Sequence, residues 1–208
     1  MRPRTIAVLL VTMATLTACT TSKGGNPTAP PTPDGPGASS PTSATGNDTF
    51  GAPRVAAPLE AAKYLSQPCT VLSATQMTKF GISTPGEPDT DSEVAKASGP
   101  GCLWRVNGEP LRMLDMSFLT GNKKGLSDTY RGRSRFAYFD ETTVDGYPAV
   151  FNDSQDGRSQ GICQMTVGIA DSLAFRASEH TSASRGAASC DGAKEFAAAV
   201  IATLKGGS

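Results

Sequence analysis

The residues best suited to nucleophilic chemistry form the pentapeptide Gly157-Arg158-Ser159-Gln160-Gly161. It matches G-x-S-x-G, the pattern of a nucleophile elbow, and Asp171 and His180 follow Ser159 in the order acid, then base. An elbow needs a strand before the serine and a helix after it. Here the pentapeptide ends a polar stretch, residues 152–161, and leads into an apolar strand-like run. The sequence therefore favours a surface loop, and a small serine hydrolase using Ser159 remains one alternative.

The sequence offers little support for a metal or cofactor site. Asp89, Asp91 and Glu93 alternate as calcium ligands do, but Val94 stands where a calcium-binding loop requires glycine. His180 is the single histidine and lies among polar neighbours, so we expect it in a solvated loop. No C-x2-C spacing is present to indicate a zinc site. We expect no metal ion and no cofactor.

A local cluster of positive charge is the second candidate site. It consists of Lys123, Lys124, Arg131, Arg133 and Arg135. The simplest interpretation is a solvated helix face, and the functional one is contact with anionic lipid head groups or wall polymers. The whole chain is neutral, with 19 basic and 19 acidic residues. This balance argues against nucleic acid as a partner, because phosphate binding requires an excess of positive charge.

The first residues of the chain have the layout of a secretory signal. Arg2 and Arg4 precede an apolar run, residues 6–16, which is too short to span a bilayer. The next residues, Leu16-Thr17-Ala18-Cys19, resemble the bacterial lipobox, in which the cysteine is diacylated and becomes the first residue after cleavage. We therefore expect a signal peptide over residues 1–18. Two acyl chains on Cys19 would anchor the mature protein stably to the outer face of the cell membrane.

A Pro/Ser/Thr-rich stretch follows Cys19. Eight of the 15 prolines lie between residues 20 and 58, with few charges and a single aromatic residue, Phe50. A segment of this composition cannot bury enough apolar surface to offset its ordering entropy. We expect residues 19–58 to form a lipidated, disordered stalk that spans about 35 Å.

Residues 59–208 are long enough for one domain. They contain four cysteines, Cys69, Cys102, Cys163 and Cys190. An even number outside the cytoplasm indicates two disulfides, for which three connectivities are open. We favour Cys69–Cys102 and Cys163–Cys190, because each bond is then local to one half of the domain. Loops of this length are stabilised by about 3–4 kcal/mol each.

Helix signals stand at both ends of this domain. Ser73 and Gln76 have capping-box spacing, and Gly81 follows as a stop signal, which predicts a short helix over residues 73–81. Apolar residues recur with helical period from 190 to 204. A third, weaker pattern covers residues 122–135 and contains two glycines.

Between these helices lie six strand candidates, arranged as three hairpins. The predicted pairs are 102–106 with 111–119, 139–144 with 147–151, and 162–169 with 173–177. Asn107-Gly108 and Asp145-Gly146 provide two of the turns. We therefore predict a single α+β domain, in which an antiparallel sheet of about six strands packs with two to three helices.

The cysteine pattern also resembles a known family. Pro68-Cys69, Gly101-Cys102-Leu103-Trp104, and Cys190 opening an alanine-rich last helix are similar to actinobacterial secreted lipoproteins known only as a domain of unknown function. The resemblance covers residues 59–208 and implies no catalytic or binding residues. More loosely, the chain resembles the α-β-α sandwich of photosystem extrinsic proteins, which implies binding or scaffolding.

These observations favour a non-enzymatic, lipid-anchored module of the cell envelope. Its expected partner is an envelope protein, a lipid or a wall polymer. The main alternative is a carrier of lipid or another small ligand, with an apolar cavity between sheet and helix near Trp104, although Trp104 itself is expected in the core.

Overall fold

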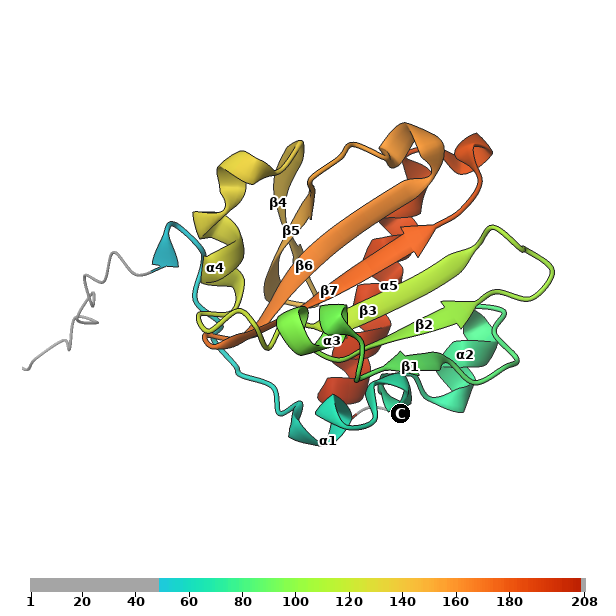
Figure 1. Ribbon diagram of the computed structural model, residues 1–208, viewed down its shortest axis with the longest axis horizontal. Helices are drawn as coiled ribbons and strands as arrows, with labels where there is room; N and C mark the ends of the chain where they lie inside the picture. The colour runs from blue at the N-terminus through green and yellow to red at the C-terminus, as the bar shows by residue number, and fades with distance from the viewer. Residues whose placement is uncertain (1–48, 207–208) are drawn as a thin grey trace, which may run out of the picture. The chain divides into compact units, whose positions relative to one another are not determined.

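The structure, a computed structural model, describes residues 49–206, and seven strands in it pair in the order β1-β2-β3-β7-β6-β5-β4 (Figure 1). Every pair is antiparallel. The strands are β1 (Glu87–Asp89), β2 (Gly101–Arg105), β3 (Met113–Phe118), β4 (Tyr138–Val144), β5 (Tyr147–Asp153), β6 (Ile162–Ala170) and β7 (Leu173–His180). The α-helices are α1 (Ala62–Leu65), α2 (Ala74–Lys79), α3 (Glu93–Ser98), α4 (Leu126–Arg131) and α5 (Ala188–Leu204). The 3-10 turns are η2 (Pro68–Val71), η3 (Arg133–Arg135), η4 (Arg158–Gln160) and η5 (Ala183–Arg185).

The three predicted hairpins are confirmed, and the strand count is corrected from six to seven. Asp145 and Gly146 both adopt positive φ, +49° and +87°, as a tight two-residue turn between β4 and β5 requires. The additional strand is β1, which pairs only with β2. Its three residues, Glu-Pro-Asp, are all exposed and carry no strand signal of their own. Pairing with the edge of β2 determines their conformation instead.

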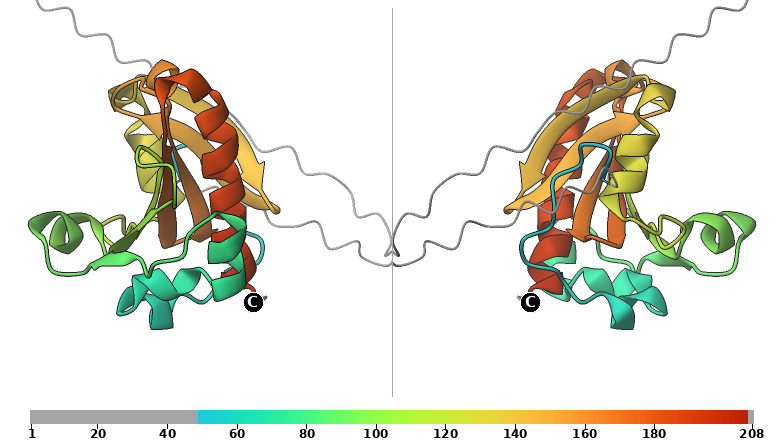
Figure 2. Two further views of the ribbon diagram at one scale, coloured as in Figure 1. Left: turned by 90° about the vertical axis from the view of Figure 1, so that its right-hand side faces the viewer. Right: turned by 90° about the vertical axis from the view of Figure 1, so that its left-hand side faces the viewer.

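Helix α5 covers one face of the sheet, and α4 lies against the opposite face (Figure 2). The apolar stripe of α5 packs on the apolar inner face of the strands, and Phe196 meets Trp104 edge-on at 5.6 Å between ring centroids. Trp104 is 1% exposed, which confirms its expected place in the core. The predicted last helix is also confirmed, and it begins two residues earlier, at Ala188.

The short helices agree only in part with those predicted from the sequence. The capping box of α2 is confirmed: Gln76 N–H donates to Ser73 Oγ at 3.3 Å, and Gln76 Oε1 accepts from Ser73 N–H at 2.7 Å. The helix predicted over 122–135 is wrong in length, because only α4 and the turn η3 form there. Gly125 precedes α4 with φ +49°, and a Cβ on it would lie 2.8 Å from the Ala170 carbonyl oxygen. Helices α1 and α3 were not predicted, so residues 49–206 contain five α-helices rather than two or three.

Both favoured cysteine pairs are present. Cys69–Cys102 joins η2 to β2 with 5.1 Å between Cα atoms, and Cys163–Cys190 joins β6 to α5 with 4.9 Å. Each disulfide therefore holds a helical element, η2 or α5, against a strand from the same half of the domain.

Residues 49–58, which we call the N-terminal strap, pack on the domain rather than standing apart from it. Ala52 and Val55 are only 5% and 9% exposed. Val55 N–H donates to Asp171, and Tyr147 Oη donates to the Ala57 carbonyl at 2.9 Å. The folded region thus includes residues that the sequence assigned to the stalk. The expected signal peptide (1–18), Cys19 and stalk residues 19–48 lie outside the described residues. None of the helices between residues 49 and 206 is long and apolar enough to cross a bilayer.

Candidate functional site

The three residues of the hydrolase pattern do not converge. Ser159 lies exposed in η4, and His180 ends β7. Asp171 lies in the turn at the opposite end of the β6–β7 hairpin, about 25 Å from His180 along a strand of this length. Its carboxylate is already bound to Arg54 Nη1 at 2.7 Å and to the Val55 N–H at 3.2 Å. The order of these residues in the sequence therefore does not correspond to a triad in space.

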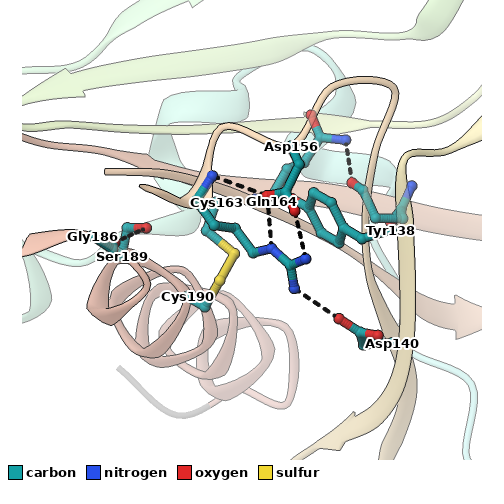
Figure 3. Close-up of a disulfide and its surroundings, with 10 residues drawn as sticks. Tyr138, Asp140, Asp156, Cys163, Gln164, Gly186, Ser189 and Cys190 are labelled. Carbon is teal, nitrogen blue, oxygen red and sulfur yellow. Dashed lines mark hydrogen bonds and ion pairs between the residues drawn. A yellow bond between two sulfur atoms is a disulfide. The ribbon is translucent and has the colours of Figure 1, made fainter. Parts of the chain in front are cut away.

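The G-x-S-x-G segment has a structural explanation, which Figure 3 shows beside the Cys163–Cys190 disulfide. Arg158 stacks 4.1 Å above the Tyr138 ring and binds both Asp156 and Asp140. Hydrogen bonds from Arg158 lower the pKa of Asp156 to about 2. Gly161 has φ +82°, and a Cβ there would lie 2.4 Å from the Ser182 carbonyl oxygen. The second glycine is thus needed for close packing of two loops.

Polar side chains instead gather on the face of the sheet away from α5. Arg176, Ser178 and His180 alternate along β7, with Phe175, Ala177 and Glu179 buried between them. Ser178 pairs with Asp115 on β3 and with Gln164 on β6, so the three strands bring their polar residues together. These side chains surround a depression of about 230 Å³, which we call the His180 hollow. It is lined by Asp115, Asp153, Ile162, Gln164, Arg176, Ser178 and His180.

Asp115 is the centre of the charge network in the His180 hollow. Its carboxylate lies 3.6 Å from Arg176 Nη2 and 3.4 Å from His180 Nε2. Both partners are partly shielded, with side chains 35% and 37% exposed. Arg176 also donates to Ser117 Oγ at 3.3 Å, while its Nε is buried and has no hydrogen-bond partner.

This environment raises the pKa of His180 above its usual value. The hydrogen bond with Asp115 is the main cause, and burial of the imidazole acts against it. The charges of Asp115 and Asp153 raise the pKa further, and the charge of Arg176 lowers it. The His180 hollow therefore offers two carboxylate acceptors, several donors and one imidazole whose pKa is raised.

The expectation that His180 lies in a solvated loop is wrong. Strand β7 continues three residues beyond the predicted end at Ala177, and its last residue is half-buried. Asp115 and Arg176 were not singled out from the sequence either. The alternation Arg176-x-Ser178-x-His180 was the available signal, since residues two apart share one face of a strand.

Glu179, the neighbour of His180, points to the other face of the sheet. It is fully buried and accepts from Arg112 Nε at 2.6 Å. A Cβ on Gly192 of α5 would lie 1.6 Å from Glu179 Oε2, so the glycine makes room for the carboxylate. This buried pair connects β7, the loop before β3 and α5, and it is separate from the His180 hollow.

The other candidate ligands lie apart from this hollow. Asp89 accepts from the Ser92 hydroxyl at 2.7 Å, which lowers the pKa of Asp89, and Ser92 caps α3. The alternating carboxylates thus help to begin a helix. Across residues 49–206, no group of three or more His, Cys, Asp or Glu side chains is placed to hold a metal ion.

The apolar space expected between sheet and helix is filled by side chains. Trp104, Met116 and Phe118 are each at most 1% exposed there. An open groove of about 630 Å³ lies elsewhere, beside α2. It is lined by Ala74, Met77, Thr78, Gly81, Ile82, Ser83 and Asn107.

The predicted basic cluster surrounds α4. Arg131 pairs with Asp128 at 2.8 Å, and its guanidinium lies 5.6 Å from the Phe50 ring centroid. Arg133 pairs with Glu141 at 3.2 Å and lies 4.6 Å from the Phe139 ring centroid. Lys123 and Arg135 are exposed, and Lys124 is half-buried.

The comparison with known proteins agrees with the resemblance to a family of unknown function that the cysteine pattern indicated. No curated protein and no solved structure matches the chain. One family model does match, over residues 14–203, and it is described as a protein of unknown function, DUF3558. Since that match covers most of the 208 residues, the chain belongs to the DUF3558 family.

Proposed function

We propose that this protein is a lipid-anchored, extracytoplasmic binding protein without enzymatic activity, and that the His180 hollow is its ligand site. The signal-like residues 1–18 and the lipobox-like Cys19 support the anchor. The observation that carries the binding site is the convergence of Asp115, Arg176 and His180 in one polar depression. This cluster is drawn from two strands and contains the chain's single imidazole.

The lining of the hollow favours a neutral, hydroxyl-rich ligand, such as a sugar unit of an envelope polymer. Two carboxylates, Asp115 and Asp153, face one guanidinium and one imidazole, so the charges nearly cancel when His180 is protonated. A hydroxyl group donates to a carboxylate and accepts from Arg176, His180 or Gln164 at the same time. The volume of about 230 Å³ lies below the 300–1,000 Å³ typical of drug-sized sites, so it suits one small polar unit.

The single histidine provides a direct test, because the His180 Hε1 proton gives one resolved NMR signal. The mature chain carrying Cys19→Ser would be titrated with glucose, mannose, N-acetylglucosamine and short oligomers of each. Inorganic phosphate and choline serve as charged comparators. We expect a saturable shift of the His180 signal with at least one neutral sugar and little change with either ion.

Two variants make this test specific to the hollow. Asp115→Asn removes the central carboxylate and should weaken sugar binding at least about tenfold, as expected when a buried polar partner is lost. Asp145→Asn changes an equivalent charge in the β4–β5 turn and should leave binding unchanged. A wild-type signal that moves with phosphate alone would assign the hollow to anions and overturn the proposal, as would equal sugar binding by Asp115→Asn.

A carrier function is the second candidate, favoured by the groove beside α2. The side chains of Met77 and Ile82 give this groove an apolar lining over about 630 Å³. Native mass spectrometry of protein purified without detergent would reveal a co-purified lipid. A lipid lost from Met77→Glu but retained by Asp115→Asn would support the carrier function over the sugar-binding one.

A further inference from the structure

The N-terminal strap enters the domain through its most basic surface. Phe50 is 46% exposed, and Arg131 of α4 lies over its ring. At the other end of α4, a second depression is lined by Thr49, Arg54, Lys124, Ser127 and Asp171, where Asp171 pairs with Arg54. We call the set of Phe50 with the five basic residues of the cluster the α4 surface. It consists of Phe50, Lys123, Lys124, Arg131, Arg133 and Arg135.

Charge is unevenly distributed between this surface and the rest of the domain. From residue 49 onward the chain has 16 basic and 17 acidic residues. Five of the basic residues belong to the α4 surface, where Asp128 pairs with Arg131 and Glu141 pairs with Arg133. The remainder of the domain therefore has eleven basic and fifteen acidic residues. The α4 surface with these two carboxylates therefore has an excess of positive charge, and the remainder of the domain has an excess of negative charge.

The two acidic partners leave the guanidiniums accessible. The Arg131 and Arg133 side chains are 58% and 59% exposed despite their ion pairs. The pair of Arg133 with Glu141 is exposed on both sides, and such pairs contribute little, because water screens them and each long side chain loses freedom when it is held. An anionic surface therefore competes readily for the same guanidiniums.

We infer that the α4 surface docks on an anionic lipid bilayer, the same membrane that the proposed anchor at Cys19 would hold. This inference rests on the anchor part of the proposed function. Thirty residues separate Cys19 from Thr49, and a chain of that length spans about 30 Å on average. The anchor therefore keeps the α4 surface within reach of the bilayer at high effective concentration.

The chemistry of the surface matches a bilayer interface. Each basic group close to anionic lipid strengthens binding about fivefold, and the effect falls off within a Debye length. An exposed aromatic ring such as Phe50 inserts favourably at the boundary between head groups and acyl chains. The charged surface adds to the proposed acyl anchor, and it would determine which face of the domain meets the bilayer.

A chemically supplied tether separates this inference from the question of lipidation in the cell. In the mature chain the thiol of Cys19 is the reactive one, since the other four cysteines are disulfide-bonded. It would be coupled to a maleimide lipid in nanodiscs of phosphatidylcholine, alone or mixed equally with phosphatidylglycerol. A gadolinium-chelating lipid then broadens the NMR signals of amides close to the bilayer.

In the mixed nanodiscs we expect amides of α4 and η3 to relax at least about threefold faster than those of β2, and we expect high salt to abolish the difference. The triple variant Arg131→Gln, Arg133→Gln, Arg135→Gln should lose this selectivity. The matched variant Lys63→Gln, Arg105→Gln, Arg185→Gln, which removes three exposed charges elsewhere, should retain it. Even broadening over the domain in the mixed nanodiscs, or identical broadening in the triple variant, would overturn the inference. Loss of membrane attachment in cells would bear on the anchor instead.

Discussion

The imidazole of His180 lies among Asp115, Asp153 and Arg176, and the charges of these neighbours shift its pKa. Its pKa in the folded protein is raised, chiefly by the hydrogen bond with Asp115. Protonated His180 therefore favours the folded state. The resulting stability is fully present below the unfolded pKa of about 6.5 and is lost as pH rises through the raised folded value.

We predict that NMR titration of His180 Hε1 gives a pKa above about 6.5 in the wild-type protein. Asp115→Asn should lower that pKa, because the main stabilising partner of the imidazolium is removed while Arg176 remains. Asp145→Asn should leave it unchanged. A wild-type pKa at or below the ordinary value would show that the pair of Asp115 and His180 does not form in solution.

A second prediction at the residue scale concerns Ser159, which lies exposed in η4. We expect Ser159→Ala to change the free energy of unfolding by less than about 0.5 kcal/mol, as at other surface positions. We also expect no fluorophosphonate labelling of the wild-type protein, because Asp171 lies at the opposite end of the β6–β7 hairpin from His180 and the three residues do not form the triad that the sequence suggested. Stoichiometric labelling of Ser159 that disappears in His180→Ala would restore the hydrolase hypothesis.

At the scale of elements, the strength of the local signal decided what could be predicted. The capping box of α2 and the Asp145-Gly146 turn specify their conformations within a few residues, and both were predicted. Strand β1 and the last three residues of β7 form because a neighbouring strand pairs with them. The residues of β1 carry no strand signal, and the end of β7 carries only the polar alternation Arg176-x-Ser178-x-His180, so long-range pairing decided both.

The contrast between local signals and long-range strand pairing also explains why the sequence did not indicate the candidate site. Asp115 and Arg176 are 61 positions apart in the sequence and meet only because β3 pairs with β7. The cysteine pairs, in contrast, followed from their number and local spacing, and both are present. A site assembled from side chains on adjacent strands depends on the pairing register of those strands. A single sequence does not specify that register.

The contact between α5 and β7 gives a prediction at this scale. Gly192→Ala should favour the helix by about 1 kcal/mol on propensity alone. Its Cβ would, however, meet the buried Glu179 carboxylate at 1.6 Å, so we expect a net loss of about 1–3 kcal/mol in urea unfolding. In a Glu179→Ala background the same change should be neutral or stabilising. A wild-type protein stabilised by Gly192→Ala would contradict the packing described for this pair.

At the scale of the whole molecule, the sheet has one covered and one partly open face. Helix α5 and the capped helix α2 close one side, while α4 covers only part of the other (Figures 1 and 2). The His180 hollow occupies the open part, and the strap joins the domain at α4. The strap and the proposed ligand site thus occupy different parts of the fold.

The anchor itself is tested by cell fractionation. Cys19→Ser removes the thiol that would be acylated, so we expect the protein to move from the membrane to the soluble extracytoplasmic fraction. Thr20→Ser, a control at the neighbouring position, should remain with the membrane. Retention of Cys19→Ser on the membrane would contradict lipid anchoring through this residue.

The most direct test of the proposed binding site is an amide chemical-shift map of the mature chain carrying Cys19→Ser, titrated with a neutral oligosaccharide. The proposed site predicts that the perturbed amides cluster around Asp115, Gln164 and residues 176–180 on the open face of the sheet. Amide perturbations centred on the Met77 groove would contradict it. So would the absence of amide perturbations around the His180 hollow with a sugar that shifts the His180 Hε1 signal.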